Sequence, residues 1–167
     1  MKLYVKQKVF SWVDKFSIYD YLGNELYSGK EKFFTISKKL DIYDSNNNHK
    51  AHIHKKVFSF LPRYFIEING EEVAQVVKKI TLFKKKFTIS GLDWEVEGDF
   101  LDHEYEIYHN GDIIAMISKE WFAFGDAYSV DIADDLDPVP ILSVVLIIDS
   151  VLGYSHNRAS VSVTIGQ

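Results

Sequence analysis

Short stretches in which apolar and polar residues alternate dominate the first 136 residues. Three of these stretches share one plan: an aromatic residue, an Ile two positions later, a turn glycine, and an apolar run that ends on lysine. They are FSIYDYLGNELYSGK (16–30), YFIEINGEEVAQVVK (64–78) and YEIYHNGDIIAMISK (105–119). A two-residue period is typical of half-buried β-strands. Asn69-Gly70 and Asn110-Gly111 tolerate the positive φ angles of a type I′ turn, and Leu22-Gly23-Asn24 is a looser version. The pattern therefore predicts three β-hairpins.

A second pair of apolar stretches follows each predicted hairpin. These pairs span residues 33–44, 80–91 and 121–133, with expected turns at 37–39, 84–86 and 125–127. The two hairpins give each repeat about four strands. The chain is expected to hold roughly twelve, counting strands at 3–10, 52–60 and 92–97. A sheet of that size must split or close, and a closed barrel of that width is too wide to be filled by its own side chains.

The stretch DPVPILSVVLIIDSVLGY (137–154) differs from everything before it, because it predicts a helix that is apolar on every side. Asp137 suits the N-cap, Pro138 and Pro140 suit the first turn, and Gly153 suits the end. A membrane span needs about 20 apolar residues, and this run is shorter. A helix lying on an open sheet would leave apolar surface in water. A helix at about 138–152 that fills the barrel satisfies both elements.

We therefore predict a mainly β fold: a closed antiparallel β-barrel of about twelve strands that encloses a hydrophobic C-terminal α-helix. The barrel domain is expected to span residues 1–155, and residues 156–167 are expected to be a tail or an edge strand. A chain of 167 residues, 47% hydrophobic and 15% aromatic, has enough material for one such core. The absence of cysteine excludes disulfides and thiolate metal sites.

The net charge of −5 hides a division along the chain. Residues 30–86 carry thirteen basic and six acidic side chains, whereas residues 87–167 carry two basic and fifteen acidic ones. This division indicates either a solvated surface on which the signs happen to separate, or a basic face for phosphates opposite an acidic face. The N-terminal segment has no apolar run of signal-peptide length, so we expect a cytoplasmic protein, with the option of a peripheral place at the membrane.

Lysines concentrate where the second hairpins are expected to turn. The candidate residues for binding lipid headgroups are Lys78, Lys79, Lys84, Lys85 and Lys86, with Lys38 and Lys39 in the corresponding turn of the first repeat. Lys55, Lys56 and Arg63 are possible additions. Clustered lysines near anionic headgroups contribute about 1 kcal/mol each. The alternative is that they keep exposed strand edges and turns soluble.

No metal, cofactor or catalytic site is predicted. His52 and His54 share a strand face with His49 nearby, but a metal needs a third ligand, and none is evident. The acidic run 131–137 lacks the glycine and closing glutamate of a calcium loop. Asp99, Asp102 and Glu104 include carboxylates of the right type for acid–base chemistry, but nothing defines their separation. Asp149 must find a partner or reach the barrel mouth. The acidic total disfavours nucleic acid.

Four segments carry a resemblance to a known family. They are KQKVFSWVDKFSIYDYLGNELY near the start, WEVEGDFLDHEYEIYHNG in the middle, ISKEWFAFGDAYSVDI, and the closing helix. Taken in order over residues 3–153, they resemble the LURP-one-related branch of the tubby-like proteins, which has many bacterial members. The resemblance implies a closed barrel around a central helix. Tubby proteins bind phosphoinositides through surface basic residues, whereas the bacterial members have no agreed activity. None of the tubby binding residues can be matched to positions here.

Two functions follow as hypotheses. The first is a non-enzymatic module that docks on anionic phospholipid headgroups through the lysines. The second is an intracellular scaffold that holds a protein partner on one of the charged faces. The sequence leaves the ligand, the partner and the oligomeric state open.

Overall fold

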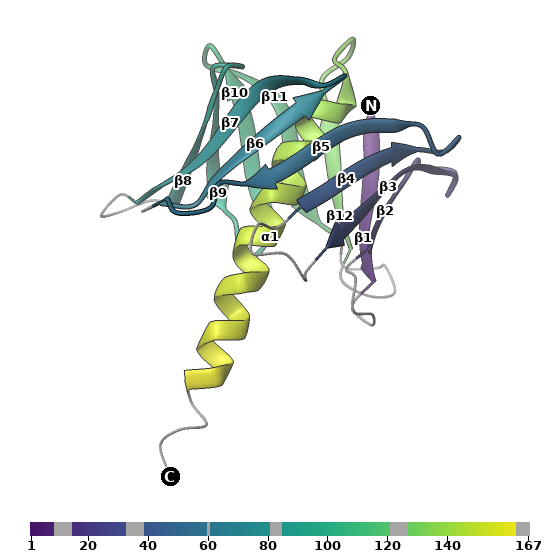
Figure 1. Ribbon diagram of the computed structural model, residues 1–167. Helices are drawn as coiled ribbons and strands as arrows, with labels where there is room; N and C mark the ends of the chain where they lie inside the picture. The colour runs from purple at the N-terminus through teal and green to yellow at the C-terminus, as the bar shows by residue number, and fades with distance from the viewer. Residues whose placement is uncertain (9–14, 33–38, 60, 81–84, 121–126, 163–167) are drawn as a thin grey trace.

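The computed structural model describes residues 1–8, 15–32, 39–59, 61–80, 85–120 and 127–162, with the backbone alone at 7–8, 15, 30–32, 78–80, 85 and 152–162. It contains a closed antiparallel barrel and one helix (Figure 1). The elements are β1 (Lys2–Lys8), β2 (Lys15–Tyr19), β3 (Glu25–Lys32), β4 (Lys39–Asp44), β5 (His49–Lys55), β6 (Arg63–Ile68), β7 (Glu71–Ile80), β8 (Lys85–Ser90), β9 (Trp94–Asp99), β10 (Glu104–His109), β11 (Asp112–Lys119), β12 (Ala127–Ile132) and α1 (Pro138–Ser162).

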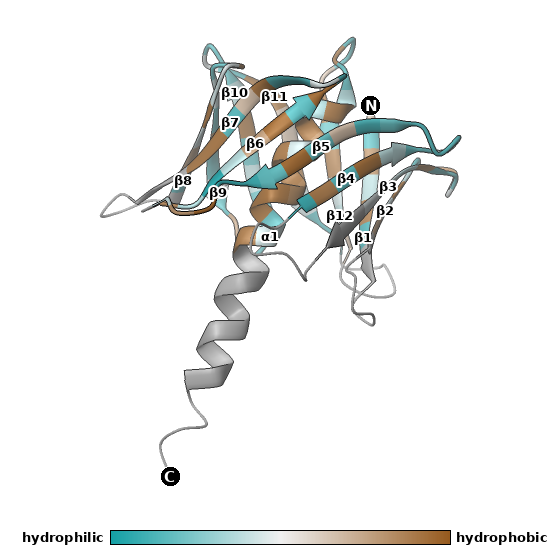
Figure 2. Ribbon diagram, in the orientation of Figure 1, coloured by the Kyte–Doolittle hydropathy of each residue, from teal (hydrophilic) through white to brown (hydrophobic). Residues whose placement is uncertain are grey.

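The strands follow one another around the barrel in chain order, and β1 closes it by pairing with both β2 and β12. The predicted class of fold, with its twelve strands and C-terminal helix, is therefore confirmed. Buried and more exposed side chains alternate along β4, β5 and β6; in β6, for example, Tyr64 and Ile66 are buried and their neighbours are more exposed. Figure 2 shows the same alternation as bands of opposite hydropathy along the strands.

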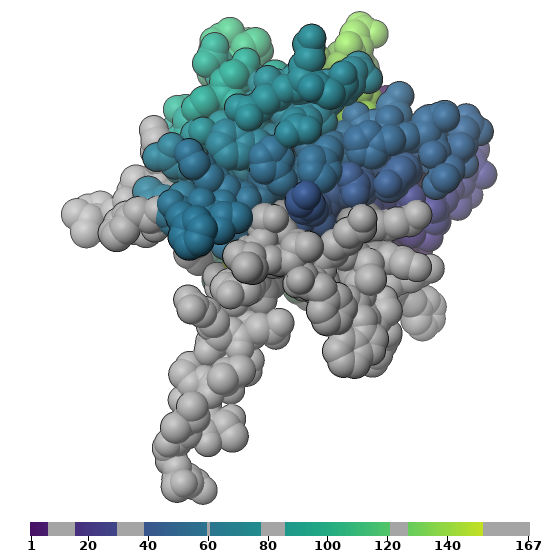
Figure 3. Space-filling model, in the orientation of Figure 1, coloured from purple at the N-terminus to yellow at the C-terminus, as the bar shows by residue number. Residues whose placement is uncertain are grey.

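The first half of α1 fills the barrel. Its side chains from Ile141 to Ile148 are buried on every side of the helix. A gap of about 10 Å³ between α1 and the β4–β6 wall has room for roughly one water molecule. In Figure 3 the side chains of β4 to β7 cover the helix on the side that faces the viewer. Within the described residues, no helix combines the length and hydropathy that a bilayer crossing requires.

The start of α1 agrees with the prediction, and its end does not. The Asp137 carboxylate accepts a hydrogen bond from the Val139 amide at 2.9 Å, which is the expected N-cap. Gly153 does not stop the helix, which runs to Ser162 and leaves the barrel at its far end (Figure 1). Residues 156–162 are thus helical rather than an edge strand, because a single glycine inside a helix costs only about 1 kcal/mol.

The structure confirms the turns predicted for two of the first hairpins. Asn69, Gly70, Asn110 and Gly111 all have positive φ, as type I′ turns require. Of the residues expected in the turns of the second hairpins, those at 37–38, 84 and 125–126 lie outside the described residues, and the others lie in strands. Lys39 begins β4, Lys85 and Lys86 begin β8, and Ala127 begins β12, so none of these residues is in a turn. The first strand expected in each second hairpin falls mostly at 33–36, 81–83 and 121–124, outside the described residues.

Candidate functional site

The helix α1 begins at one end of the barrel and leaves it at the other (Figure 1). At the end where α1 begins, which we call the short-turn rim, the strands are joined by turns of two to five residues. These turns lie at 20–24, 45–48, 69–70, 91–93 and 110–111. The other end, where α1 leaves the barrel, we call the helix-exit rim (Figure 1). Because neighbouring strands are antiparallel, every odd-numbered strand ends at the helix-exit rim and every even-numbered strand begins there.

Basic residues are common at the helix-exit rim, where Lys8, Lys15, Lys32 and Lys119 also end or begin strands β1, β2, β3 and β11. Strands β4 to β8 are consecutive neighbours in the barrel, and each has basic residues at or beside the end that reaches this rim. We call the set the basic arc: Lys39, Lys55, Lys56, Arg63, Lys78, Lys79, Lys85 and Lys86. The topology therefore brings together the backbone positions of five of the predicted lysines and of the three possible additions. Lys38 and Lys84, which were also predicted, lie outside the described residues.

The connection between β5 and β6, residues 56–62, carries an exposed aromatic side chain within the basic arc. The Lys56 amide donates a hydrogen bond to the Arg63 carbonyl at 2.8 Å and closes the base of this loop. Phe58 is 100% exposed, beside the partly exposed Val57. Its φ is +62°, a conformation that is uncommon for a bulky residue and that recurs at functional sites. Sequence reasoning missed this residue, because only the structure shows that its side chain is exposed rather than buried in the core.

Lys86 differs from the other members of the basic arc, because two carboxylates hold it. Its Nζ lies 2.6 Å from Glu95 and 2.8 Å from Glu97, both on the adjacent strand β9. The hydrogen bonds to Glu95 and then to Glu97 raise the pKa of Lys86 above its ordinary value. Its charge is therefore compensated within the protein itself.

A second cluster joins the helix to the barrel wall. Asp149 accepts hydrogen bonds from His103 Nε2 and from the Tyr128 hydroxyl, each at 2.8 Å, and its side chain is only 7% exposed. The rings of His103 and Tyr128 are stacked, with centroids 4.6 Å apart. Burial, and then the negative charge of Asp149, raise the pKa of Tyr128 well above its ordinary value. These contacts supply the partners that a carboxylate in a buried helix needs, and they fix α1 to β12 and to the turn before β10.

Three histidines lie on the outer surface of β5, where a carboxylate of the adjacent strand β4 joins two of them. Asp41 Oδ1 is 2.7 Å from His52 Nδ1 and 3.2 Å from His49 Nε2. His54, on the same face as His52, instead contacts Glu67 through Nδ1 at 3.3 Å. Burial works to raise the pKa of Asp41, but the hydrogen bonds from His52 and His49 outweigh it and lower that pKa. The third donor that the sequence did not reveal is therefore Asp41.

A model of the LURP-one-related family matches residues 1–149. The chain belongs to the LURP-one-related family. The match spans all twelve strands and the first half of the helix, which are the parts that form the closed core. The resemblance seen in the sequence is thus confirmed.

A relative and a solved structure agree with this membership. "Uncharacterized protein YxjI" of Bacillus subtilis (strain 168) is 37% identical over 152 residues, which cover 91% of this chain and 94% of that protein. An X-ray structure of a protein from Arabidopsis thaliana matches with a TM-score of 0.63 and 17% identity, over 90% of this chain and 91% of that one. The Arabidopsis structure supports the fold alone. The name of the Bacillus protein states no activity.

Proposed function

We propose that this LURP-one-related protein is a non-enzymatic module that docks its helix-exit rim on membranes containing anionic phospholipids. The observation that carries the proposal is Phe58, fully exposed between Lys56 and Arg63. An aromatic side chain in water beside cations is typical of peripheral membrane proteins, in which apolar groups enter the headgroup region and basic ones contact anionic lipids.

The free energies expected for the basic residues and for Phe58 at a membrane surface support the proposal. Each lysine or arginine near an anionic surface contributes about 1 kcal/mol. Burying one phenylalanine contributes about 1.5–3 kcal/mol. Lys39, Lys56, Arg63 and Phe58 are all exposed. Together they would give a reversible, salt-sensitive association, without an anchor that spans the bilayer.

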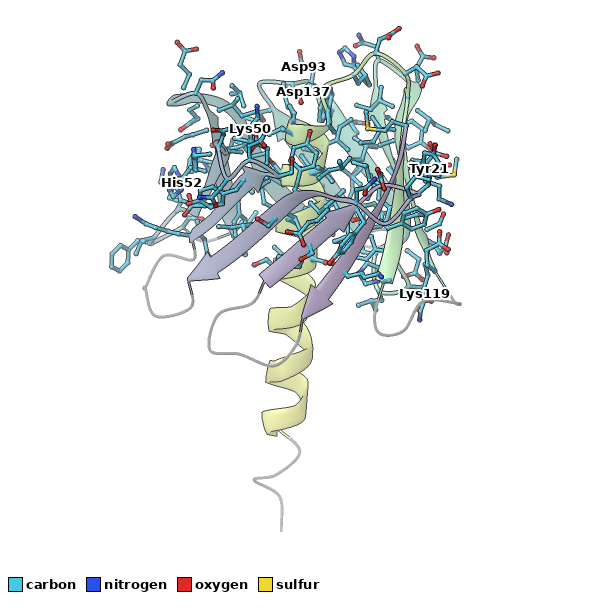
Figure 4. The ribbon with its side chains drawn as sticks, turned by 90° about the vertical axis from the view of Figure 1, so that its right-hand side faces the viewer. Tyr21, Lys50, His52, Asp93, Lys119 and Asp137 are labelled. Atoms are coloured by element: carbon cyan, nitrogen blue, oxygen red, sulfur yellow. The ribbon has the colours of Figure 1, made fainter. Side chains whose placement is uncertain are left out.

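Vesicle sedimentation tests the proposal. Phosphatidylcholine vesicles with and without phosphatidylserine are mixed with the wild-type chain and with the double variant Lys56→Gln/Arg63→Gln. Losing two charges is expected to weaken binding to the anionic vesicles by about 30-fold, at about 1 kcal/mol for each charge. Lys50→Gln is the matched control, because Lys50 lies on β5 near the short-turn rim (Figure 4). The triple variant Lys84→Glu/Lys85→Glu/Lys86→Glu tests the lysines predicted at 84–86, of which Lys85 and Lys86 belong to the basic arc.

Binding must also weaken as salt is added, since exposed charges are screened. If the wild-type chain fails to sediment with anionic vesicles even at low ionic strength, the lipid proposal is wrong.

The second candidate is a protein-interaction scaffold, which the charge of the short-turn rim favours. Exposed carboxylates gather there, from Asp93, Asp112, Asp134, Asp135 and Asp137. This acidic surface would suit a basic protein partner. The two candidates use opposite ends of the barrel, so substitutions at one rim distinguish them.

A further inference from the structure

The cluster of Asp41, His49 and His52 has the composition and spacing of a metal site. One donor atom from each side chain lies within 4.8 Å of the other two. Two imidazoles and one carboxylate are a ligand set that late first-row transition ions prefer, whereas Mg²⁺ and Ca²⁺ prefer oxygen alone. Figure 4 shows His52 on the outside of the barrel wall, where an ion from solvent can reach it.

The pairing of strands brings the three residues together. Asp41 lies directly opposite His52 in the β4–β5 ladder. His49 is three residues before His52, and in a regular strand residues at that spacing face opposite sides. The register shifts between Ile42 and Tyr43, so that Tyr43 pairs with His49 while Ile42 pairs with Ala51. This bulge at Lys50 returns His49 to the outer face, and bulges commonly redirect a side chain in this way.

Surrounding rings hold the two imidazoles in place. The His52 ring stacks on His54, with centroids 5.7 Å apart, and His54 stacks on Phe65 at 5.2 Å. The His49 and Tyr43 rings form a T-shaped pair, with centroids 5.5 Å apart. Because Asp41 Oδ1 already contacts both imidazoles, the donors are gathered before an ion arrives. Preorganised ligands lose less conformational entropy on binding.

The distances suit an ion of the size of Zn²⁺. Zinc lies about 2.0–2.2 Å from nitrogen and oxygen ligands, so tetrahedral ligands are roughly 3.3 Å apart. The separation between Asp41 Oδ1 and His49 Nε2 is 3.2 Å, and that between Asp41 Oδ1 and His52 Nδ1 is 2.7 Å. The second must widen by roughly half an ångström, which a side-chain rotation supplies. The exposed fraction of the His49 side chain, 47%, leaves space for water as a further ligand.

We propose that Asp41, His49 and His52 form a surface site for one divalent late first-row transition ion of the zinc class. This site is on the β4–β5 wall and does not depend on the proposed membrane function.

Calorimetry with Zn²⁺ alone tests the site. The full chain is freed of metal with a chelator and titrated near neutral pH, and one ion per chain is expected. The variants Asp41→Asn, His49→Ala and His52→Ala are each expected to weaken binding by about tenfold or more, because each removes a ligand. His109→Ala is the matched control, since His109 is an exposed strand histidine of β10 away from the cluster.

A second measurement separates metal binding from folding. Co²⁺ added to the wild-type chain is expected to give visible absorption bands that Asp41→Asn loses while its thermal unfolding stays cooperative. Mg²⁺ is expected to give no heat. The proposal is overturned if millimolar Zn²⁺ gives no binding heat, or if the three variants bind as tightly as His109→Ala does.

Discussion

The Asp149 carboxylate on α1 accepts a 2.8 Å hydrogen bond from the Tyr128 hydroxyl on β12. This bond links the central helix to the strand that closes the barrel against β1. A hydrogen bond to a charged group contributes about 1.5–3 kcal/mol, and a buried carboxylate that loses a partner is costly. We therefore expect Tyr128→Phe to lower the free energy of unfolding by about 2 kcal/mol, measured by urea denaturation. Tyr4→Phe removes a hydroxyl outside this cluster and serves as the control. An equal effect of both substitutions would contradict the role given to Asp149.

Removing the hydroxyl of Tyr105 is expected to have the opposite effect on stability. Its hydroxyl is buried with no hydrogen-bond partner among the described residues, so Tyr105→Phe is expected to be neutral or to stabilise the protein by about 1 kcal/mol at neutral pH. Burial, and then the charge of Asp149, raise the pKa of Tyr105 well above its usual value of 10.0. The unfolded chain therefore releases this proton first, and stability that is present below pH 10 is lost as the pH rises further. Urea denaturation of Tyr105→Phe at neutral and alkaline pH should show a smaller alkaline loss than the wild-type chain. An unchanged alkaline loss would argue against a buried phenol.

Substitutions of Gly98 and Gly111 test how closely the backbones of β9, β10 and β11 are packed. Gly98 has φ +141°, and a Cβ there would lie 2.5 Å from both the Glu104 carbonyl and the Tyr105 Cα. Gly111 has φ +91° and open space around it. We expect Gly98→Ala to cost about 3 kcal/mol or more, because backbone must shift, and Gly111→Ala about 1–2 kcal/mol, from the dihedral angle alone. Thermal unfolding of both variants checks the order, and a reversed order would show that the two strands are not packed as described.

Leu146 tests the filling of the barrel. It is fully buried in α1, whereas Leu101 is exposed in the turn before β10. Leu146→Ala is expected to cost about 2–5 kcal/mol through lost burial and a cavity, and Leu101→Ala less than about 0.5 kcal/mol. Denaturant midpoints of the two variants provide the comparison. A small effect at Leu146 would mean that the helix does not form the core.

The parts of this fold that sequence reasoning predicted are those set by local patterns. Asn69-Gly70 and Asn110-Gly111 specify their turns through their own φ preferences, and the apolar surface of residues 141–148 requires burial on all sides. A further local signal lies in two of the turns. Asp20 accepts hydrogen bonds from Leu22 and Asn24, and Asp44 does the same from Asn46 and Asn48. An Asp four residues before an Asn thus marks two turns of the short-turn rim.

The parts that sequence reasoning missed depend on register and exposure. Asp41 is eleven residues from His52, and only the β4–β5 pairing and the bulge at Lys50 bring it to the histidines. Phe58 lies in a short apolar stretch that resembles a strand end, and only the closed barrel shows that it is left in water. Gly153 has the residue type of a helix stop, but α1 continues through it.

A fluorescent reporter at Phe58 tests the membrane proposal most directly. The chain has no cysteine, so Phe58→Cys provides a single site for an environment-sensitive dye, and Tyr21→Cys provides the control. Tyr21 is 77% exposed in the turn after β2, at the opposite end of the barrel. With vesicles that contain phosphatidylserine, the dye at position 58 is expected to shift to shorter emission wavelengths, and the dye at position 21 is expected to stay unchanged. No shift at position 58 at low salt, or a shift at position 21 alone, would contradict the account.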